Sequence, residues 1–173
     1  PGAPFSYWVS DKLRGVFKTF AAFKNAHRSA RQGLASGDDF RFARMWWEVA
    51  GGDIAPFDSH HIVANGPYCE VQHKWQSFAK GGNISPYYTD FKMICNWQGD
   101  VKEIKNFVDV QTGKIRSRPQ NTQFYYTPGY TWPLRALRYT PSVLPRGTIF
   151  SVRSMSAFCD NPGAFIVSGN SRT

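Results

Sequence analysis

The sequence lacks any apolar run that could cross a membrane. Its longest uncharged apolar stretches fall short of the ~20 residues that a spanning helix requires. It opens with Pro1-Gly2-Ala3-Pro4, without an initiator Met and without the basic and apolar regions of a secretory leader. We therefore expect a cytoplasmic segment of a longer polypeptide, with no membrane among its partners.

Enzyme motifs and cysteine pairs are missing as well. The sequence contains no GxGxxG, Walker loop, GxSxG or paired-carboxylate arrangement. Its three cysteines, Cys69, Cys95 and Cys159, are widely spaced and form no CxxC pair, so neither a zinc cluster nor a redox motif is indicated. Isolated cysteines of this kind are most often small buried hydrophobic residues in a reducing compartment. We expect no catalytic centre and no cofactor within this chain.

Potential metal ligands form one dense group, around His60, His61 and His73. The pair His60-His61 is similar to the start of an HNH-type nuclease motif, in which a histidine activates water beside a metal. No Asn or further His follows at a convincing spacing, and paired histidines in a polar loop are more often surface residues. A metal-dependent HNH-like nuclease is therefore an alternative, while we predict no metal site.

Acidic residues are fewer than basic ones, and one long stretch of the sequence lacks them altogether. Lys and Arg number 21 against 12 Asp and Glu, which gives a net charge of +9. The stretch from Val110 to Cys159 holds seven Lys or Arg and no acidic residue, whereas the stretch from Met45 to His73 holds no Lys or Arg. A like-charged block that is also rich in aromatic and turn residues is not typical of a solvated helix face. It indicates contact with a polyanion, most commonly phosphates, and a basic surface that only aids solubility is the alternative.

Hydrophobic periodicity predicts an α+β fold in which strands predominate. Ser10 is placed as the N-cap of an amphipathic helix over 11–24. Residues 91–97 suit a strand or a buried helix, and residues 107–114 suit a hairpin. Further strands, separated by Pro and Gly turns, are predicted at 31–35, 42–49, 123–126, 134–139, 148–152 and 164–167. No repeat or linker divides the chain, so we expect one domain over 1–173.

Three segments combine cations, glycines and aromatic residues as nucleic-acid contact surfaces do. In 31–44, glycines allow close backbone approach, and arginines can pair with phosphates or guanine edges. Residues 74–82 are predicted as a loop whose amides and lysines suit a phosphate, and 125–138 joins aromatic residues to two arginines. The candidate DNA-binding residues are Arg31, Gly33, Gly37, Arg41, Arg44, Lys74, Lys80, Gly81, Gly82, Lys114, Arg116, Arg118, Tyr130, Trp132, Arg135 and Arg138.

Each of these segments has a plainer alternative, a core-forming strand pair with surface arginines. For the neighbouring Trp46 and Trp47 we prefer a place in the core, because clustered tryptophans are usually buried. A module for single-stranded nucleic acid or RNA, with the aromatic residues as stacking platforms, is a further alternative.

In this order, the segments resemble the region that follows the catalytic domain in large adenine-specific DNA methyltransferases, namely the BREX phage-defence methyltransferases and fused type IIG restriction–modification enzymes. The resemblance spans residues 5–160. It is carried by PFSYWVSD at 4–11, RQGLASGDDFRFARMWWEV at 31–49, KWQSFAKGG at 74–82, Tyr87, Tyr88, Asp90, Asn96, Trp97, Thr131-Trp132 and the Leu-Pro-x-Gly-x-Ile-Phe segment at 144–150. Several such motifs in one order are fairly specific.

The resemblance implies a target-recognition domain that binds double-stranded DNA in restriction–modification or phage defence. In such enzymes an upstream domain binds S-adenosylmethionine and methylates the adenine amine, so the methyltransferase domain is the implied partner in cis. This chain departs from the full-length pattern because the cofactor loop, the Asn-Pro-Pro-Tyr loop and any nuclease motif are missing, and we expect them upstream of Pro1. Asp38-Asp39 also stands where Gly-Asp-Asn is more usual, either as a turn cap or as an acceptor for a cytosine amine. The main alternative is a protein-interaction domain of the same defence system, marked by an exposed apolar patch.

Overall fold

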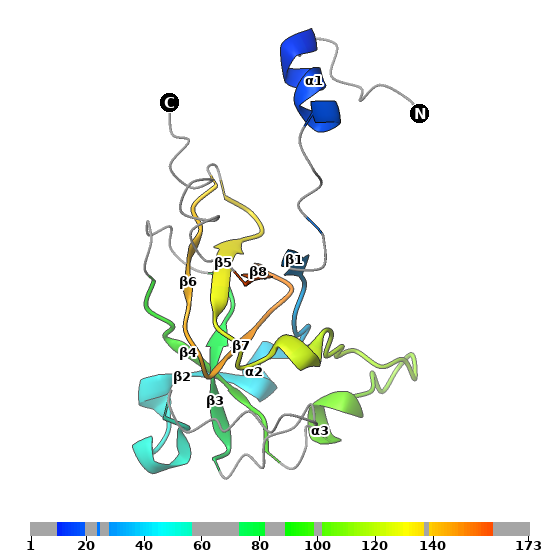
Figure 1. Cartoon of the computed structure of the whole chain (residues 1–173). Helices are drawn as coiled ribbons and strands as arrows, with labels where there is room; N and C mark the ends of the chain where they lie inside the picture. Colours follow the sequence, from blue (N-terminus) through cyan, green and yellow to red (C-terminus); the bar gives the residue numbers. More distant parts are fainter. Residues whose placement is uncertain are drawn as a thin grey trace.

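Two four-stranded sheets dominate the part of the chain that the structure describes (Figure 1). The structure is a computed structural model, and it describes residues 10–19, 24, 28–56, 73–81, 89–98, 102–136 and 139–160. The fold is a strand-rich α+β fold, as the sequence predicts. Its first element, α1 (Asp11–Thr19), confirms the N-terminal helix but is shorter than the predicted 11–24, because Lys24 is not helical.

One sheet is antiparallel throughout and has the strand order β1-β8-β5-β6. Its strands are β1 (Arg28–Arg31), β8 (Ser154–Cys159), β5 (Gly129–Pro133) and β6 (Ser142–Leu144). β5 is the middle of a three-strand run, since it pairs with both β6 and β8. Its aromatic and β-branched residues suit an extended strand, and its last residue, Pro133, has no N–H to continue the ladder.

The other sheet has the strand order β2-β4-β3-β7 and contains one parallel pair, β3 with β7. Its strands are β2 (Ala43–Met45), β4 (Met93–Asn96), β3 (Trp75–Ala79) and β7 (Thr148–Phe150). All five side chains of β3 are buried, and a strand covered on both faces shows no polar alternation in its sequence. The prediction of a loop over 74–82 is therefore wrong for most of its length, because β3 is an inner strand of this sheet.

Short helical turns connect the strands. They are α2 (Asp39–Phe42), η1 (Trp46–Glu48), η2 (Gly51–Asp53), α3 (Lys102–Lys105) and η3 (Thr122–Phe124). The Asp38 carboxylate caps α2 by accepting a hydrogen bond from the Arg41 backbone N–H at 3.1 Å, which is the turn-cap role that its position predicts. The strand predicted over 42–49 is reduced to the three residues of β2, because α2 and η1 occupy the chain on either side of it.

Several of the predicted strands and turns are present. β4 is the strand alternative for 91–97, and β7 covers the first three residues of 148–152. The hairpin over 107–114 is confirmed by an antiparallel bridge between Val108 and Ile115. These segments have the clearest local signals, which are apolar runs bounded by Gly or Pro.

Two predicted strands are wrong. Half of residues 123–126 belong to η3, and the segment ends at Tyr126, whose φ of 65° lies in the left-handed region that a strand cannot adopt. In the described part of 134–139 no strand is present, because β5 has already ended. Of 31–35 only the first residue belongs to β1, and 164–167 lies outside the described residues.

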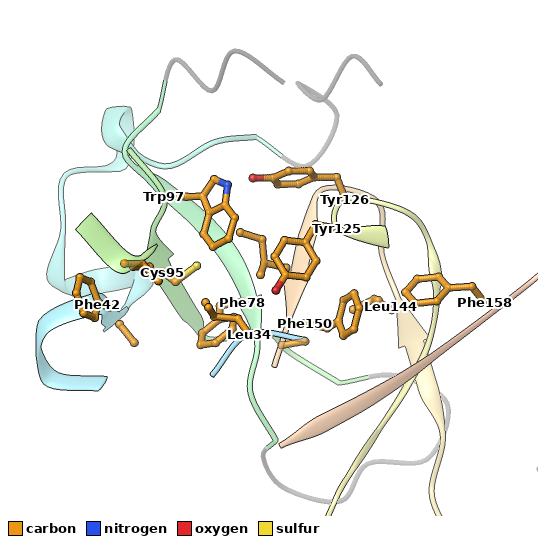
Figure 2. Close-up of a cluster of buried hydrophobic side chains, with 14 residues drawn as sticks. Leu34, Phe42, Phe78, Cys95, Trp97, Tyr125, Tyr126, Leu144, Phe150 and Phe158 are labelled. Atoms are coloured by element: carbon orange, nitrogen blue, oxygen red, sulfur yellow. The ribbon is translucent and has the colours of Figure 1, made fainter. Parts of the chain in front are cut away.

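Aromatic side chains from both sheets form a common core (Figure 2). The Phe150 ring of β7 lies 5.3 Å from the rings of both Tyr125 and Phe158, centroid to centroid. Tyr125 in turn meets Trp97 edge-to-face at 5.4 Å. Such contacts add to the stabilisation that aromatic burial already provides. They fasten β7 of one sheet to β8 of the other.

Trp46 and Trp47 do not belong to this core, so the prediction that they are buried is wrong. Their side chains are 54% and 56% exposed, and their rings meet each other edge-to-face at 5.6 Å. The turn η1 that carries them is closed by Glu48, whose carboxylate accepts a hydrogen bond from the Met45 N–H at 2.7 Å. An outward turn after a three-residue strand thus replaces the longer strand that would have buried them.

Gly33→Ala should destabilise the protein by about 3 kcal/mol. A Cβ at Gly33 would overlap the carbonyl oxygen of Phe150, and the Leu34 N–H donates to that same oxygen at 2.8 Å, so neither segment can move aside freely. Urea unfolding measures the loss. Gly51→Ala is the matched control, because a Cβ there meets nothing within 4 Å, and equal losses in the two variants would refute the packing argument.

Candidate nucleic-acid interface

A basic pocket of about 460 Å³ lies where strand ends from the two sheets come together. Its lining residues are Gln32, Ala35, Lys80, Gly81, Arg118, Pro133, Leu134, Arg135, Val152 and Arg153. Four of these carry positive charge, and none of the ten is acidic. The pocket therefore collects cations from four separate stretches of chain and has the electrostatic character of an anion site.

Backbone hydrogen bonds fix the walls of the basic pocket. The Leu134 N–H donates to the Arg153 carbonyl at 2.9 Å, which joins the end of β5 to the turn between β7 and β8. Arg118 and Ala35 exchange both of their backbone hydrogen bonds, at 2.7 and 3.0 Å. The four cationic side chains thus project from backbone that hydrogen bonds hold in place, so a ligand can bind without rearrangement of the backbone.

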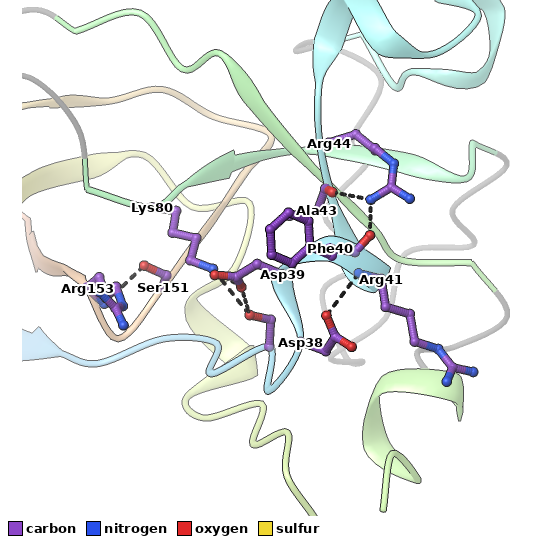
Figure 3. Close-up of polar contacts among 10 residues, drawn as sticks. Asp38, Asp39, Phe40, Arg41, Ala43, Arg44, Lys80, Ser151 and Arg153 are labelled. Atoms are coloured by element: carbon purple, nitrogen blue, oxygen red, sulfur yellow. Dashed lines mark hydrogen bonds and ion pairs between the residues drawn. The ribbon is translucent and has the colours of Figure 1, made fainter.

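Lys80 is the most buried of the four cations, with a side chain that is 9% exposed. Figure 3 shows its ammonium group directed at Asp39, with which it forms an ion pair. The Ser36 hydroxyl lies 3.3 Å from the Lys80 Nζ, and it donates to the same Asp39 carboxylate. Burial, together with the nearby Arg153 guanidinium, lowers the pKa of Lys80 to about 8.

The three arginines of the basic pocket are exposed and have no carboxylate partner among the residues that the structure describes. Arg118, Arg135 and Arg153 each keep the planar, five-donor guanidinium that binds phosphate oxygens two at a time. Arg153 was not among the residues predicted from the sequence. The signal that could have found it is its place in the acid-free stretch between Val110 and Cys159.

Other predicted DNA-binding cations are engaged within the fold. Both Nε and an Nη of Arg41 donate to one carboxylate oxygen of Glu103, at 3.0 and 2.8 Å. The Arg116 guanidinium lies 3.7 Å from the Asp109 carboxylate. Arg44 donates to two backbone carbonyls of its own segment (Figure 3). These side chains have less to offer an external anion than the three pocket arginines.

The remaining predicted residues are spread over the described structure. The Arg31 guanidinium lies over the Phe124 ring and the Lys74 ammonium over the Trp75 ring. Residues that complete this set are half-buried Tyr130 and Trp132, exposed Lys114, buried Gly33 and positive-φ Gly37. Gly81 also has a positive φ, and it lines the basic pocket. Gly82 and Arg138 lie outside the described residues.

Of the three histidines considered as metal ligands, the structure describes one, His73. His73 Nδ1 lies 3.1 Å from the carbonyl of Gly52, while His60 and His61 lie outside the described residues. Within the described part, no three His, Cys, Asp or Glu side chains are grouped so as to hold a metal. Nor does that part contain a helix with the length and apolarity needed to span a bilayer. Of the cysteines, Cys95 is buried as predicted, Cys159 is half-buried, and Cys69 lies outside the described residues.

Sulfate binding to the basic pocket should weaken as the pH rises through about 8. Lys80 loses its proton over this range, whereas arginine and sulfate keep their charges. Loss of one charge near the ligand should lower the affinity about fivefold, roughly 1 kcal/mol. Calorimetric titration of the protein with sulfate at rising pH measures this change. In Lys80→Met the pH dependence should vanish, and its persistence would show that another group is responsible.

The chain is similar to a small part of two large methyltransferases. It is 26% identical over 162 residues to "Adenine-specific methyltransferase PglX" of Lacticaseibacillus casei (strain Zhang), a match that covers 93% of this chain and 13% of that protein. It is also 26% identical over 163 residues to "Adenine-specific methyltransferase BrxX" of Escherichia coli O9:H4 (strain HS), covering 93% of this chain and 12% of the relative. No protein-family model matches the chain. The chain is thus homologous to a segment of adenine-specific methyltransferases and spans only 12–13% of the length of these relatives.

Proposed function

We propose that the chain is a single target-recognition domain that binds double-stranded DNA for an adenine-specific DNA methyltransferase of phage defence or restriction–modification. The observation that carries the proposal is the basic pocket, in which four cations and no acidic residue surround one hollow. The homology to two adenine-specific methyltransferases supports DNA as the polyanion. The chain would act as the DNA-binding part of such an enzyme in the cytoplasm.

Binding would begin with the sugar–phosphate backbone of the duplex. Contacts to phosphates position a protein on DNA and supply most of its sequence-independent affinity. Arg118, Arg135 and Arg153 are suited to this task because they are exposed and unpaired within the described part. The other predicted cations and glycines, together with Tyr130 and Trp132, would contribute contacts around the pocket, including any to base edges in the major groove.

Chemistry would belong to the rest of the parent enzyme. Methyl transfer to adenine requires S-adenosylmethionine, and the sequence of this chain contains no glycine-rich cofactor loop. We propose that a methyltransferase domain linked to this chain binds S-adenosylmethionine, while this domain holds the DNA. The chain alone would then bind duplex DNA without methylating it.

Duplex DNA should bind to the chain with an affinity that falls steeply with salt, with a Kd in the micromolar range or weaker at physiological ionic strength. Each arginine replaced by alanine at 118, 135 or 153 should reduce the slope of log affinity against log salt by about 0.9, because one phosphate contact is lost. Fluorescence anisotropy with a labelled duplex measures both quantities.

Arg146→Ala is the matched control for these variants, because Arg146 is also exposed but does not line the basic pocket. It should leave the slope nearly unchanged. Competition with single-stranded DNA of the same sequence separates a duplex-binding domain from a single-strand module. An affinity independent of salt, or a preference for the single strand, would contradict the proposed function.

A second candidate function, docking on another protein domain, is favoured by the exposed pair Trp46 and Trp47. Both tryptophans are more than half exposed, and tryptophan is enriched at the centres of protein interfaces. The partner that the homology suggests is the methyltransferase domain of the same enzyme. Neither tryptophan lines the basic pocket, so docking through this pair and DNA binding at the pocket are compatible.

The double variant Trp46→Ser, Trp47→Ser should associate at least tenfold more weakly with a methyltransferase domain supplied as a separate polypeptide. Loss of a central interface tryptophan costs about 2 kcal/mol or more. The affinity of the chain for duplex DNA should stay the same. Analytical ultracentrifugation and anisotropy measure the two outcomes. Unchanged association would remove the docking role from this tryptophan pair.

A further inference from the structure

The ion pair between Lys80 and Asp39 stands at the wall of the basic pocket. Lys80 lines the pocket, whereas Asp39 does not. The Asp39 carboxylate also accepts the Ser36 hydroxyl, so it is held in place from a second side. Lys80 therefore already has an internal anion as its partner (Figure 3). The three pocket arginines have no carboxylate partner among the described residues.

The size of the basic pocket indicates what kind of external anion it takes. Its volume of about 460 Å³ falls within the ~300–1,000 Å³ typical of small-molecule sites. A bare anion would leave most of this space empty, whereas a phosphate with its attached sugar would occupy more of it. Pro133, Leu134 and Val152 supply an apolar part of the wall against which a sugar can pack.

We infer that the basic pocket binds one phosphodiester group of a nucleic-acid backbone, and that Asp39 competes with this phosphate for Lys80. The inference rests on the proposed function, because it takes DNA as the source of the phosphodiester. The phosphate meets the three arginines first, since they are exposed and unpaired within the described part. Lys80 then moves from Asp39 to the phosphate, or shares its three N–H donors between the two.

This competition sets the affinity of the site. A carboxylate beside the lysine repels the incoming phosphate and must be left behind or shared, and both effects weaken binding. In return, Asp39 neutralises part of the repulsion between Lys80 and Arg153 when no ligand is present. Asp39 thus stabilises the basic pocket when no ligand is bound, and it keeps the affinity of the pocket for phosphate moderate.

The test is the affinity of Asp39→Asn for three probes: a short duplex DNA, the dinucleoside monophosphate d(TpT), and inorganic phosphate. Asp39→Asn should bind duplex DNA and d(TpT) about fivefold more tightly than the unmodified protein, because a competing charge has been removed. Asp38→Asn is the matched control. It removes the same charge one residue away, from a carboxylate that caps α2 through the Arg41 N–H, and it should change the affinity less than twofold.

A double-mutant cycle separates competition for Lys80 from a general effect on the fold. In a Lys80→Met background, Asp39→Asn should no longer improve binding, because the lysine for which Asp39 competes is absent. Thermal unfolding of each variant shows whether it remains folded at the temperature of measurement. If Asp39→Asn loses stability, Asp39→Ser provides a second way of removing the charge while keeping a hydroxyl near Ser36 and Lys80.

The outcomes distinguish this inference from the proposed function. Salt-dependent duplex binding that Asp39→Asn and Asp38→Asn change equally would refute the competition and leave DNA binding intact. Tight binding of inorganic phosphate without binding of duplex DNA or d(TpT) would refute both the backbone as ligand and the proposed function. A gain in Asp39→Asn that persists in the Lys80→Met background would refute the role of Lys80.

Discussion

The parallel register of β3 with β7 is the constraint on which the rest of the described fold depends. The last three residues of β3 stand opposite the three residues of β7, so the two strands end at the same edge of the sheet. The Ser151 N–H then donates to the Ala79 carbonyl at 2.9 Å, and the chain turns at once into β8 of the other sheet. Lys80 and Arg153, which follow these two strands, are brought together by this geometry. The basic pocket is therefore a product of strand register.

Bringing like charges together at the edge of a packed core costs stability. Lys80 is nearly buried beside Arg153, which disfavours its charged form. Phe150 is the last residue of β7, just before the turn that carries Arg153. Its aromatic contacts tie this segment to both sheets. Clustered like charges on a backbone that is held by hydrogen bonds are typical of a binding site. The rigid support keeps the charges in place for a ligand.

The sequence predicted those parts of the fold that depend on residues close together in the chain. The hairpin with its bridge between Val108 and Ile115, the strand β4 and the cap of α2 by Asp38 all follow from turn residues and apolar runs. β3 escaped prediction because burial on both faces removes the alternation that marks a strand. Trp46 and Trp47 were misplaced because composition cannot show that a three-residue strand ends in an outward turn.

The sequence predicted most of the cations of the candidate site, but not that they lie together around one pocket. The acid-free stretch from Val110 to Cys159 already indicated a polyanion, and Lys80, Arg118 and Arg135 were predicted as contacts. Their convergence with Arg153 depends on pairing between distant strands, which one sequence does not display. The same holds for the engagement of Arg41 by Glu103, 62 residues further along the chain.

The pairing of β1 with β8 also bears on how the protein is made. Within the described part, β1 has β8 as its sole neighbour, with Arg28 opposite Cys159 and Arg31 opposite Ser156. Every residue from β1 through β8 must leave the ribosome before β1 can find its partner. Until then its backbone N–H and C=O groups are open to other strands, a situation that slows folding and invites aggregation. Truncation before β8 would accordingly leave the N-terminal strand without a sheet to join.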